Sequence, residues 1–352
     1  MLRQIARLGH AVPSISPRAW AVAIYASADD DTMVAREAGF EGVACVDDTA
    51  RALELYCELW NETKLPWARA WCDGLLDFVL AMQDSDGRWV NFIRDWSGTP
   101  NLVGRTSVAG GDFWQARAML SLAKASHVLD DPRIVAALAK GLVHLVNKPV
   151  AADVRSLHVL AALAMAKGGE HGDLRPLVSS WCDELIECSL DGVLMNSSWE
   201  NGQPHLWAHY QESALCDASD YLGRPELLDV ARRSADKVFI ELIHSRFERD
   251  LTNPFDVAVS CEAMRRLART TDDKKYGMLV GEAREWFNGR NPADQPVYDR
   301  VKGRVADGID LGVLNDHSGA ESNIVAAQAL FDDVIVLAPT LSSDEAGGPN
   351  WT

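Results

Sequence analysis

Two adjacent aspartates, Asp47 and Asp48, stand where a short apolar stretch gives way to a helical pattern. An aspartate at a helix start accepts hydrogen bonds from the free N–H groups of the first turn, so we expect Asp47 to cap the helix. The pKa of a second carboxyl beside it is raised by like charge and burial, whereas Arg51, one turn later, lowers it. Asp48 is therefore a candidate acid–base residue, with Asp47 in reserve.

A third acid, Asp112, follows two glycines in the segment GGDFWQAR and stands at the start of another predicted helix. It could simply be a helix cap. Hydrolysis of a glycosidic bond usually needs two carboxyls, one as acid and one as base or nucleophile. We therefore predict Asp48 and Asp112 as the catalytic pair.

A polar, aromatic loop, SSWENGQPHLWAHYQE, supplies further candidates: Trp199, Glu200, His205 and His209. Two histidines four residues apart could bind a metal on a helix. Pro204 indicates that His205 precedes the helix, so hydrogen bonding to a sugar, or plain packing, is favoured. We predict no metal. Glu200 could equally be a solvated loop acid.

The segment SGAESN near the C-terminus adds Glu321, which could serve the site or form a capping box with Ser318. Aromatic faces stack on sugar rings, and amides, carboxylates and guanidinium groups bind hydroxyls. The residues predicted on these grounds to position a substrate also include Arg51, Asn91, Arg105, Trp114 and Arg117.

Helical periodicity dominates the chain, and two kinds of helix alternate. One kind is amphipathic, as in 66–83 and 225–243; the other is apolar nearly all round, as in 156–166 and 323–338. The apolar helices begin near residues 47, 112, 154, 208, 256 and 320, and the amphipathic helices near 66, 132, 174, 225 and 274, with 2–8 as a sixth. Six inner helices ringed by six outer ones predict an all-α protein, a single (α/α)6 toroid domain over 1–339, with a mobile tail at 340–352.

The long loops carry turn and strand signals and precede inner helices, at 84–111, 191–206 and 289–319. In a toroid this places short β-hairpins on one face, at the N-terminal ends of the inner helices. The free N–H groups and positive dipole ends lie there, so we expect a funnel-shaped site on that face.

Four segments, CVDDTAR, GRWVNFIRDW, GGDFWQARAML and SGAESNIVAAQAL, resemble the toroid domains often attached to bacterial family-four-type glycosyltransferases. Those domains belong to the six-hairpin glycosidase superfamily. The resemblance covers about 40–335, with Thr49 and Asn323 departing from the usual Asn and Thr. It implies the toroid fold and a carbohydrate ligand. The placing of Asp48 and Asp112 also resembles unsaturated glucuronyl hydrolases, and the adjacent pair resembles endo-mannanases.

Three functions fit these residues. The leading interpretation is a glycoside hydrolase acting on an oligosaccharide or glycoconjugate. The second is a non-catalytic glycan-binding domain that serves a separate glycosyltransferase, because the resembling domains are commonly fused to one. The third is a sugar epimerase or isomerase, in which His205, His209 or His317 would transfer protons.

The composition excludes several other classes. A net charge of −17 argues against nucleic acid and anionic membrane surfaces as partners. The first 20 residues hold no apolar stretch long enough for a signal peptide, and no run approaches the roughly 20 apolar residues of a membrane span, so we expect neither. The seven cysteines contain no CxxC motif and suggest reduced core residues of a cytoplasmic protein. No glycine-rich phosphate loop occurs, so we predict no cofactor.

Overall fold

The computed structural model describes residues 1–27, 41–146, 148–169, 171–200 and 202–348. Contacts divide the chain into two compact units. Unit 1 comprises 1–147, 298–307 and 315–352, and unit 2 comprises 148–297 and 308–314. Each unit is built from helices with strands of two or three residues between them. The expectation of one domain over 1–339 stays a prediction.

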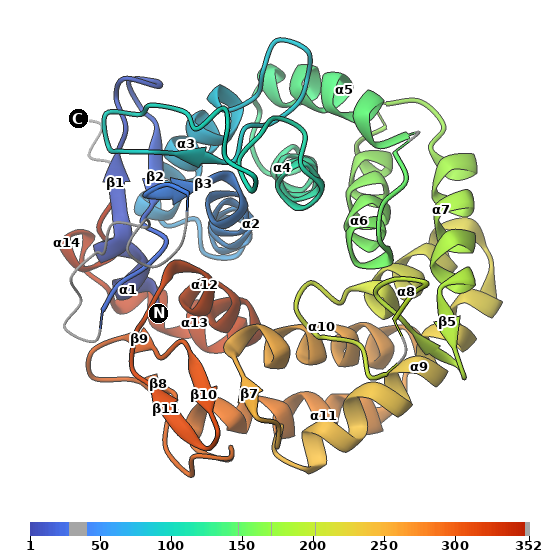
Figure 1. Cartoon of the computed structure of the whole chain (residues 1–352). Coiled ribbons are helices and arrows are strands. Elements are labelled where there is room, and N and C mark those ends of the chain that lie inside the picture. The colour runs from blue at the N-terminus through green and yellow to red at the C-terminus, as the bar shows by residue number, and fades with distance from the viewer. Residues whose placement is uncertain (28–40, 147, 170, 201, 349–352) are drawn as a thin grey trace. The chain divides into compact units, whose positions relative to one another are not determined.

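Unit 1 contains two helical hairpins and the C-terminal helices (Figure 1). Its helices are α1 (Leu2–Leu8), α2 (Val46–Thr63), α3 (Pro66–Ala81), α4 (Asp112–Ala125), α5 (Pro132–Val146), α12 (Ala320–Ala329), α13 (Phe331–Leu337), η2 (Ala338–Thr340) and α14 (Ser343–Ala346). Helix α2 packs against α3, α4 and α12, and α1 packs against α12 and α14.

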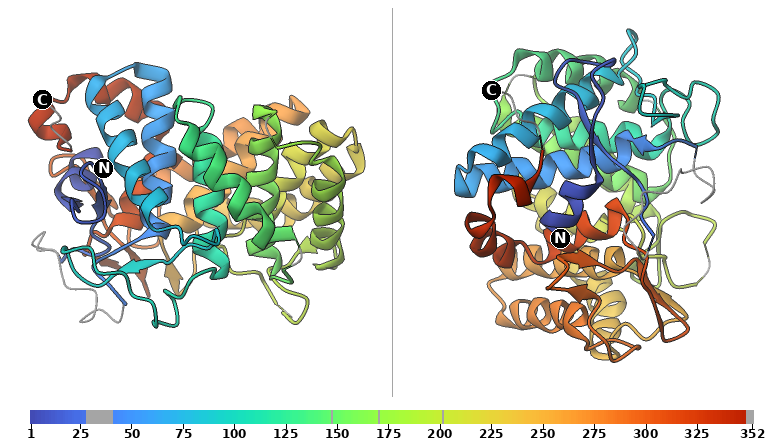
Figure 2. Two further views of the ribbon diagram at one scale, coloured as in Figure 1. Left: turned by 90° about the horizontal axis from the view of Figure 1, so that it is seen from above. Right: turned by 90° about the vertical axis from the view of Figure 1, so that its left-hand side faces the viewer.

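The strands of unit 1 form antiparallel pairs that sit between helices. They are β1 (Gly9–Ala11) with β2 (Trp20–Val22), β3 (Ala44–Cys45) with β4 (Phe92–Ile93), and β8 (Tyr298–Asp299) with β9 (Arg304–Val305). Strand β3 leads directly into α2, and β4 lies in the long loop before α4, with Cys45 opposite Phe92. This pairing holds the loop at the N-terminal end of α2 (Figure 2).

Unit 2 consists of three helical hairpins with two small sheets. Its elements are α6 (Ala152–Gly168), α7 (Arg175–Glu187), β5 (Ser189–Leu190), β6 (Val193–Leu194), α8 (Gln211–Leu222), α9 (Pro225–His244), β7 (Leu251–Thr252), α10 (Pro254–Thr271), α11 (Lys274–Arg284), η1 (Glu285–Asn288), β10 (Gly308–Asp310) and β11 (Val313–Asn315). Helix α8 packs against α6, α9 and α10. The loop from β6 to α8 carries the polar residues discussed below.

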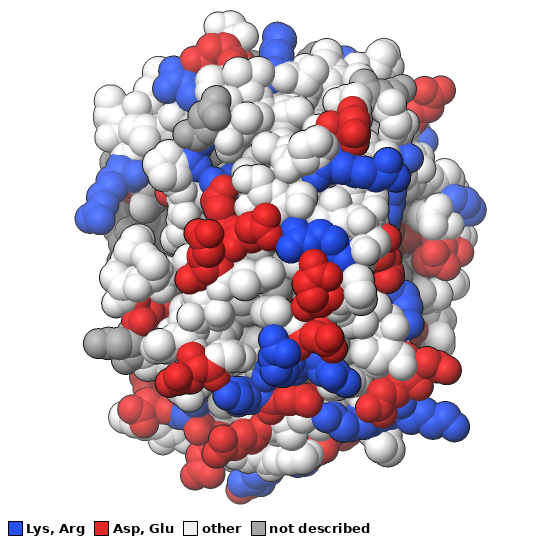
Figure 3. All heavy atoms as spheres, turned by 90° about the vertical axis from the view of Figure 1, so that its right-hand side faces the viewer, with Lys and Arg blue, Asp and Glu red and all other residues white. Residues whose placement is uncertain are grey.

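The two predicted kinds of helix differ in burial as expected. Helix α6 is buried on nearly every side along Ala152–Leu163, whereas α11 buries one stripe, Tyr276, Leu279 and Ala283. The exposed faces of α7 and α9 carry acids and bases close together (Figure 3). Such exposed pairs, for example Arg224 with Asp183 at 2.9 Å, contribute little stability each.

The prediction of one continuous apolar helix over 323–338 is wrong, because the helix is broken at Leu330. Helix α12 ends there, and α13 starts at Phe331 after a bend of 92°. Asp332 and Asp333 lie in the first turn of α13, where acids stabilise a new N-terminus. No single helix among the described residues has the length and hydropathy of a membrane span; α12 and α13 reach them only together, across this bend.

The predicted tail begins with ordered contacts. Ser342 and Glu345 form a capping box at the start of α14, and Arg3 Nη2 lies 2.7 Å from Glu345 Oε1. The carbonyl oxygen of Ala346 accepts a hydrogen bond from Trp71 Nε1 at 3.1 Å. The last part of the tail, 349–352, lies outside the described residues.

Candidate active site

The aspartate doublet lies inside the first turn of α2, and neither aspartate is the N-cap. Cys45 holds that position, and its sulfur accepts a hydrogen bond from the Asp48 N–H at 3.4 Å. The Asp47 N–H donates to Asn91 Oδ1 at 3.2 Å, and the Val46 N–H donates to the Asn91 carbonyl at 2.8 Å. The prediction that Asp47 caps the helix is therefore wrong. Because β3 runs straight into α2, the cap falls two residues earlier, and the loop before α4 satisfies the first N–H groups.

The carboxyls instead bind arginines. Arg51 Nη1 lies 2.5 Å from Asp48 Oδ1, and its Nη2 lies 3.3 Å from Asp47 Oδ2. The same Nη2 lies 2.8 Å from Glu321 Oε2, and Arg117 Nε lies 2.5 Å from Asp47 Oδ1. These five residues come from α2, α4 and α12, and we call them the carboxyl–arginine cluster. Two guanidinium groups thus bind three carboxyls, which lie in the first turns of α2 and α12.

Asp48 has the perturbed acidity expected of an acid catalyst. It is 5% exposed, and burial raises its pKa to about 6. The positive charge of Arg51 opposes this increase, whereas the negative charges of Glu321 and Asp47 add to it. The Cys45 thiol donates a hydrogen bond to Asp48 Oδ2 at 3.3 Å. Near neutral pH this carboxyl is therefore partly protonated.

Glu321 takes part in the cluster and not in a capping box with Ser318. Helix α12 starts at Ala320 with Gly319 as its N-cap. The Ser318 hydroxyl donates to the Val305 carbonyl at 2.8 Å and accepts from Asn323 Nδ2 at 3.0 Å. The capping-box interpretation is therefore wrong, because Ser318 already has two other partners and Arg51 holds the Glu321 carboxylate.

The other predicted residues of unit 1 divide into supporting and exposed groups. Asn91 Nδ2 donates to the Thr106 carbonyl at 2.9 Å, so its amide joins the loop to α2. Trp114 is largely buried, and its Nε1 donates to the Trp89 carbonyl at 2.9 Å. Asp112 is exposed at the first position of α4, and Arg105 is exposed in the preceding loop. The contact from α4 to the doublet comes from Arg117, one turn beyond Asp112.

The remaining predicted residues lie in unit 2, around the loop before α8. His205 Nε2 lies 3.7 Å from Asp153 Oδ2 and 3.8 Å from Glu200 Oε1. Burial raises the pKa of Asp153, which stands in the first turn of α6. Trp199 is 78% exposed, and the Trp207 ring centroid is 6.1 Å from that of His205. We call Asp153, Glu200 and His205 the histidine–carboxyl group.

His209 has a different role because it is fully buried. Its Nδ1 lies 2.7 Å from Asn196 Oδ1, and its Nε2 lies 3.0 Å from Glu212 Oε2. The Ser234 hydroxyl donates to Glu212 Oε1 at 2.5 Å. These contacts tie the loop to α8 and α9, so His209 supports the loop that carries Glu200 and His205. As predicted, His205 precedes the helix. His209 precedes it too, because α8 starts at Gln211 and not near residue 208.

Sequence reasoning missed Asp153, Tyr25 and Asp307. Asp153 could have been found, because it is an acid in the first turn of an apolar helix, like Asp48. Tyr25 and Asp307 lie in irregular segments and carry no local signal. Within the described parts of the chain, no group of three or more His, Cys, Asp or Glu residues could hold a metal ion.

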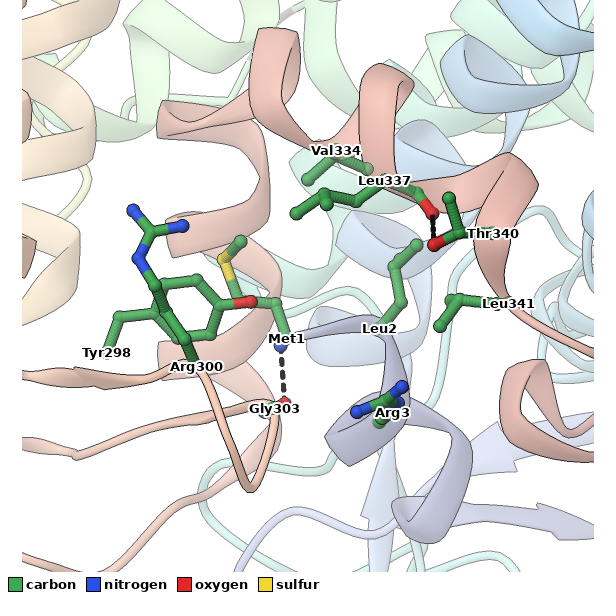
Figure 4. Close-up of a pocket in the computed structure, with 10 residues that line it drawn as sticks. All are labelled: Met1, Leu2, Arg3, Tyr298, Arg300, Gly303, Val334, Leu337, Thr340 and Leu341. Carbon is green, nitrogen blue, oxygen red and sulfur yellow. Dashed lines mark hydrogen bonds between the residues drawn. The ribbon is translucent and has the colours of Figure 1, made fainter.

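A pocket of about 160 Å³ lies in another part of unit 1 (Figure 4). Leu2, Val334 and Leu341 give it an apolar side, and Tyr298 and Arg300 lie on another. None of the predicted site residues lines it. The expected funnel-shaped site at the N-terminal ends of the inner helices therefore stays a prediction.

Comparisons with known proteins find similar solved structures but no matching family model or curated sequence. No family model and no curated protein matches the sequence. Cellobiose 2-epimerase from Bacillus thermoamylovorans B4167 matches with a TM-score of 0.68 at 11% identity, over 92% of this chain and 96% of that chain. D-mannose isomerase matches with a TM-score of 0.67 at 10% identity, over 96% of both chains. A family 76 glycoside hydrolase from a bovine Bacteroides thetaiotaomicron strain matches with a TM-score of 0.64 at 11% identity, over 94% of this chain and 77% of that chain.

The chain has the (α/α)6 toroid fold. This confirms the predicted all-α class and the predicted toroid architecture. In the order of a toroid, α2, α4, α6, α8, α10 and α12 are the inner helices. The carboxyl–arginine cluster and the histidine–carboxyl group therefore both lie at, or just before, the N-terminal ends of inner helices.

Proposed function

We propose that this protein is a carbohydrate-active enzyme that hydrolyses a glycosidic bond, with Asp48 as the general acid. The observation that carries the proposal is the raised pKa of Asp48, about 6, beside carboxyls bound by arginines. An acid catalyst must hold its proton near the working pH and release it as the leaving group departs. The similarity to structures of sugar-acting enzymes supports a carbohydrate as the substrate class.

The reaction needs a second group that accepts a proton. Asp48 gives its proton to the glycosidic oxygen, the bond from that oxygen to the anomeric carbon breaks, and water supplies the hydroxyl that replaces it. Asp47 is already bound by two guanidinium groups, those of Arg51 and Arg117. We assign the water-activating role to Asp112, the exposed acid at the start of α4. Arg51 then holds the acid, and Arg117 and Glu321, which bind Asp47 and Arg51, are assigned with it to the binding of substrate hydroxyls.

The test is a hydrolysis assay with matched variants. The wild type is incubated with cellobiose, an α-mannobiose and α-mannan oligosaccharides, and the release of reducing ends is measured. Asp48→Asn should lower turnover by roughly 10²–10⁴, the usual contribution of general acid catalysis. Asp256→Asn is the control, because Asp256 is also a buried carboxyl at the third position of an inner helix, within a capping box. Equal turnover for Asp48→Asn and the wild type would exclude this role.

A second candidate function is a sugar isomerase or epimerase, and the histidine–carboxyl group favours it. His205 lies between Asp153 and Glu200, and such a histidine can remove a proton from carbon and return it. D-mannose and cellobiose incubated in deuterium oxide would then gain deuterium at carbon 2. His205→Gln should abolish that exchange. Hydrolysis without exchange would exclude this candidate.

The same assays also test the alternative that the protein is a glycan-binding domain without catalytic activity. If the wild type binds oligosaccharides but neither cleaves nor exchanges them, the chain is an accessory domain for a separate glycosyltransferase. Asp48→Asn would then alter affinity only modestly.

A further inference from the structure

Tyr25 and His317 form a side-chain pair that the catalytic scheme above does not use. The Tyr25 hydroxyl makes a short hydrogen bond with His317 Nδ1. Their rings meet edge to face, with centroids 5.2 Å apart and planes at 82°. Both residues are half-buried, and they lie 292 positions apart in the chain. A polar pair of this kind is either a tie between segments or part of a binding site.

The pair borders the carboxyl–arginine cluster on two sides. Tyr25 packs against Ile24, Cys45 and Phe92, and the Cys45 thiol donates to Asp48. His317 precedes α12, whose Glu321 binds Arg51. The pair therefore lies between the starts of α2 and α12, the two helices that carry Asp48 and Glu321.

The backbone holds His317 in place on both sides. Its N–H donates to Asn315 Oδ1 at 3.1 Å, and its carbonyl accepts from the Asp307 N–H at 2.8 Å. Asp307 Oδ1 in turn accepts from the Gly319 N–H at 2.7 Å. A histidine fixed in this way presents its ring in one orientation, as a binding group must.

The pair is not needed to hold the two segments together. The Ser318 N–H already donates to the Ala26 carbonyl at 3.1 Å, and the Ala320 N–H donates to the Ile24 carbonyl at 3.0 Å. These backbone bonds join the same segments without help from the side chains. A purely structural role would thus duplicate contacts that the backbone supplies.

The bond also bears on the hydrogen-bonding roles of the two imidazole nitrogens. Burial, with the charge of Asp307, raises the pKa of Tyr25, so its hydroxyl keeps a proton that it can donate to His317 Nδ1. With that donation, Nδ1 accepts and Nε2 is the nitrogen that carries the N–H donor. His317 then offers an N–H donor just before α12, and Glu321 in the first turn of α12 supplies a carboxylate acceptor. A sugar hydroxyl can accept from an N–H donor and donate to a carboxylate.

We propose that His317 binds a sugar hydroxyl through Nε2–H beside the reacting bond, and that Tyr25 is a positioning residue that fixes its tautomer. This inference rests on the proposed function, because it places the sugar at the carboxyl–arginine cluster. It adds a specificity determinant to that site.

Two variants with a matched control test it. Tyr25→Phe removes only the hydroxyl and keeps the ring packing, and His317→Gln removes the imidazole. Tyr276→Phe is the control, because the Tyr276 hydroxyl donates to Asp236 Oδ1 at 3.0 Å between two outer helices of unit 2. Binding of D-mannose, cellobiose and an α-mannobiose is measured by calorimetry, and hydrolysis is followed where it occurs. The ¹⁵N signals of His317 are recorded with and without each sugar.

We expect Kd or KM to rise about 3- to 10-fold in both variants, the effect of one hydrogen bond, with a smaller change in kcat. The melting temperature should change by less than about 3 °C, and Tyr276→Phe should bind like the wild type. The His317 signals should show the Nε2–H tautomer in the wild type, move on sugar addition, and change in Tyr25→Phe.

Unchanged affinity in both variants, or His317 signals that no sugar moves, would overturn the inference. That result differs from a failure of the proposed function, which is full turnover in Asp48→Asn. If Asp48→Asn is fully active while His317→Gln weakens sugar binding, the binding role stands and the acid role does not.

Discussion

Arg51 Nη1 lies 2.5 Å from Asp48 Oδ1, one helical turn away at the start of α2. The other terminal nitrogen of Arg51 binds Asp47 and Glu321, so one buried guanidinium group serves three carboxyls. A charge taken out of water is stable only when its partners neutralise it. The cluster therefore depends on each of its members, and removal of a single carboxyl breaks an ion pair with a buried guanidinium group.

Asp47→Ala should cost about 3 kcal/mol in the free energy of unfolding, more than the roughly 0.5–2 kcal/mol of a lost helix cap. The substitution removes the carboxylate that both Arg51 and Arg117 bind, and both arginines are buried. Urea unfolding measures the difference. Asp112→Ala, at an exposed first-turn position, is the control and should change stability by less than about 0.5 kcal/mol. If Asp47→Ala lowered the free energy of unfolding by less than about 1 kcal/mol, the stabilising role of its ion pairs with Arg51 and Arg117 would be contradicted.

The stability of Asp48→Asn relative to the wild type should depend on pH. The pKa of Asp48 is about 6 in the folded state and 3.8 as its ordinary value, so its stabilising contribution is present below pH 4 and is lost as pH rises through 6. Asparagine does not titrate. Between pH 4 and 7, the free energy of unfolding of the variant should therefore increase relative to that of the wild type, by on the order of 3 kcal/mol. Unfolding curves at several pH values check this, and a constant difference would disprove the raised pKa.

The hydrolytic activity of the wild type should decline above about pH 6. An acid catalyst works only while protonated, so kcat/KM should fall about tenfold per pH unit once the pKa of Asp48 is passed. Initial rates from pH 4.5 to 8.5 measure this limb of the profile. The residual activity of Asp48→Asn should lack the limb, while Asp256→Asn should keep it. If Asp48→Asn showed the same decline of kcat/KM above about pH 6, the decline would be due to the titration of another group.

Gly111→Ala should destabilise the loop before α4. A Cβ atom at this position would lie 1.7 Å from Trp114 Cζ2, and the Trp114 ring is held by its bond to the Trp89 carbonyl. The ring must move, which costs roughly 1–3 kcal/mol. Gly277→Ala is the control, because a Cβ there meets nothing within 4 Å and alanine favours the α11 helix. Equal stability of the two variants in thermal unfolding would contradict the packing of Trp114.

The helices could be predicted because their signals are local. Pro66, Pro132 and Pro225 begin helices where a missing N–H costs nothing, and Asp112 begins α4 as expected. The alternation of all-apolar and amphipathic segments specified which helices are inner, and hence the fold. The break at Leu330 escaped this reasoning, because the apolar period continues across it and only the acids Asp332 and Asp333 mark the new start.

The types of residue in the site also followed from the sequence, since Asp48, Arg51, Arg117 and Glu321 were all named at helix starts. Their partners did not, because a side chain's partner depends on how helices pack. The sequence suggested Asp47 as a cap, and for Glu321 it left a site role and a capping box with Ser318 as alternatives. In the tertiary structure α4 brings Arg117 to Asp47, and α12 brings Glu321 to Arg51. The start of a helix is determined locally, by the groups that bind its first N–H groups. Which charged side chains meet is decided only by the packing of α2, α4 and α12. That packing therefore also decides the pKa of Asp48.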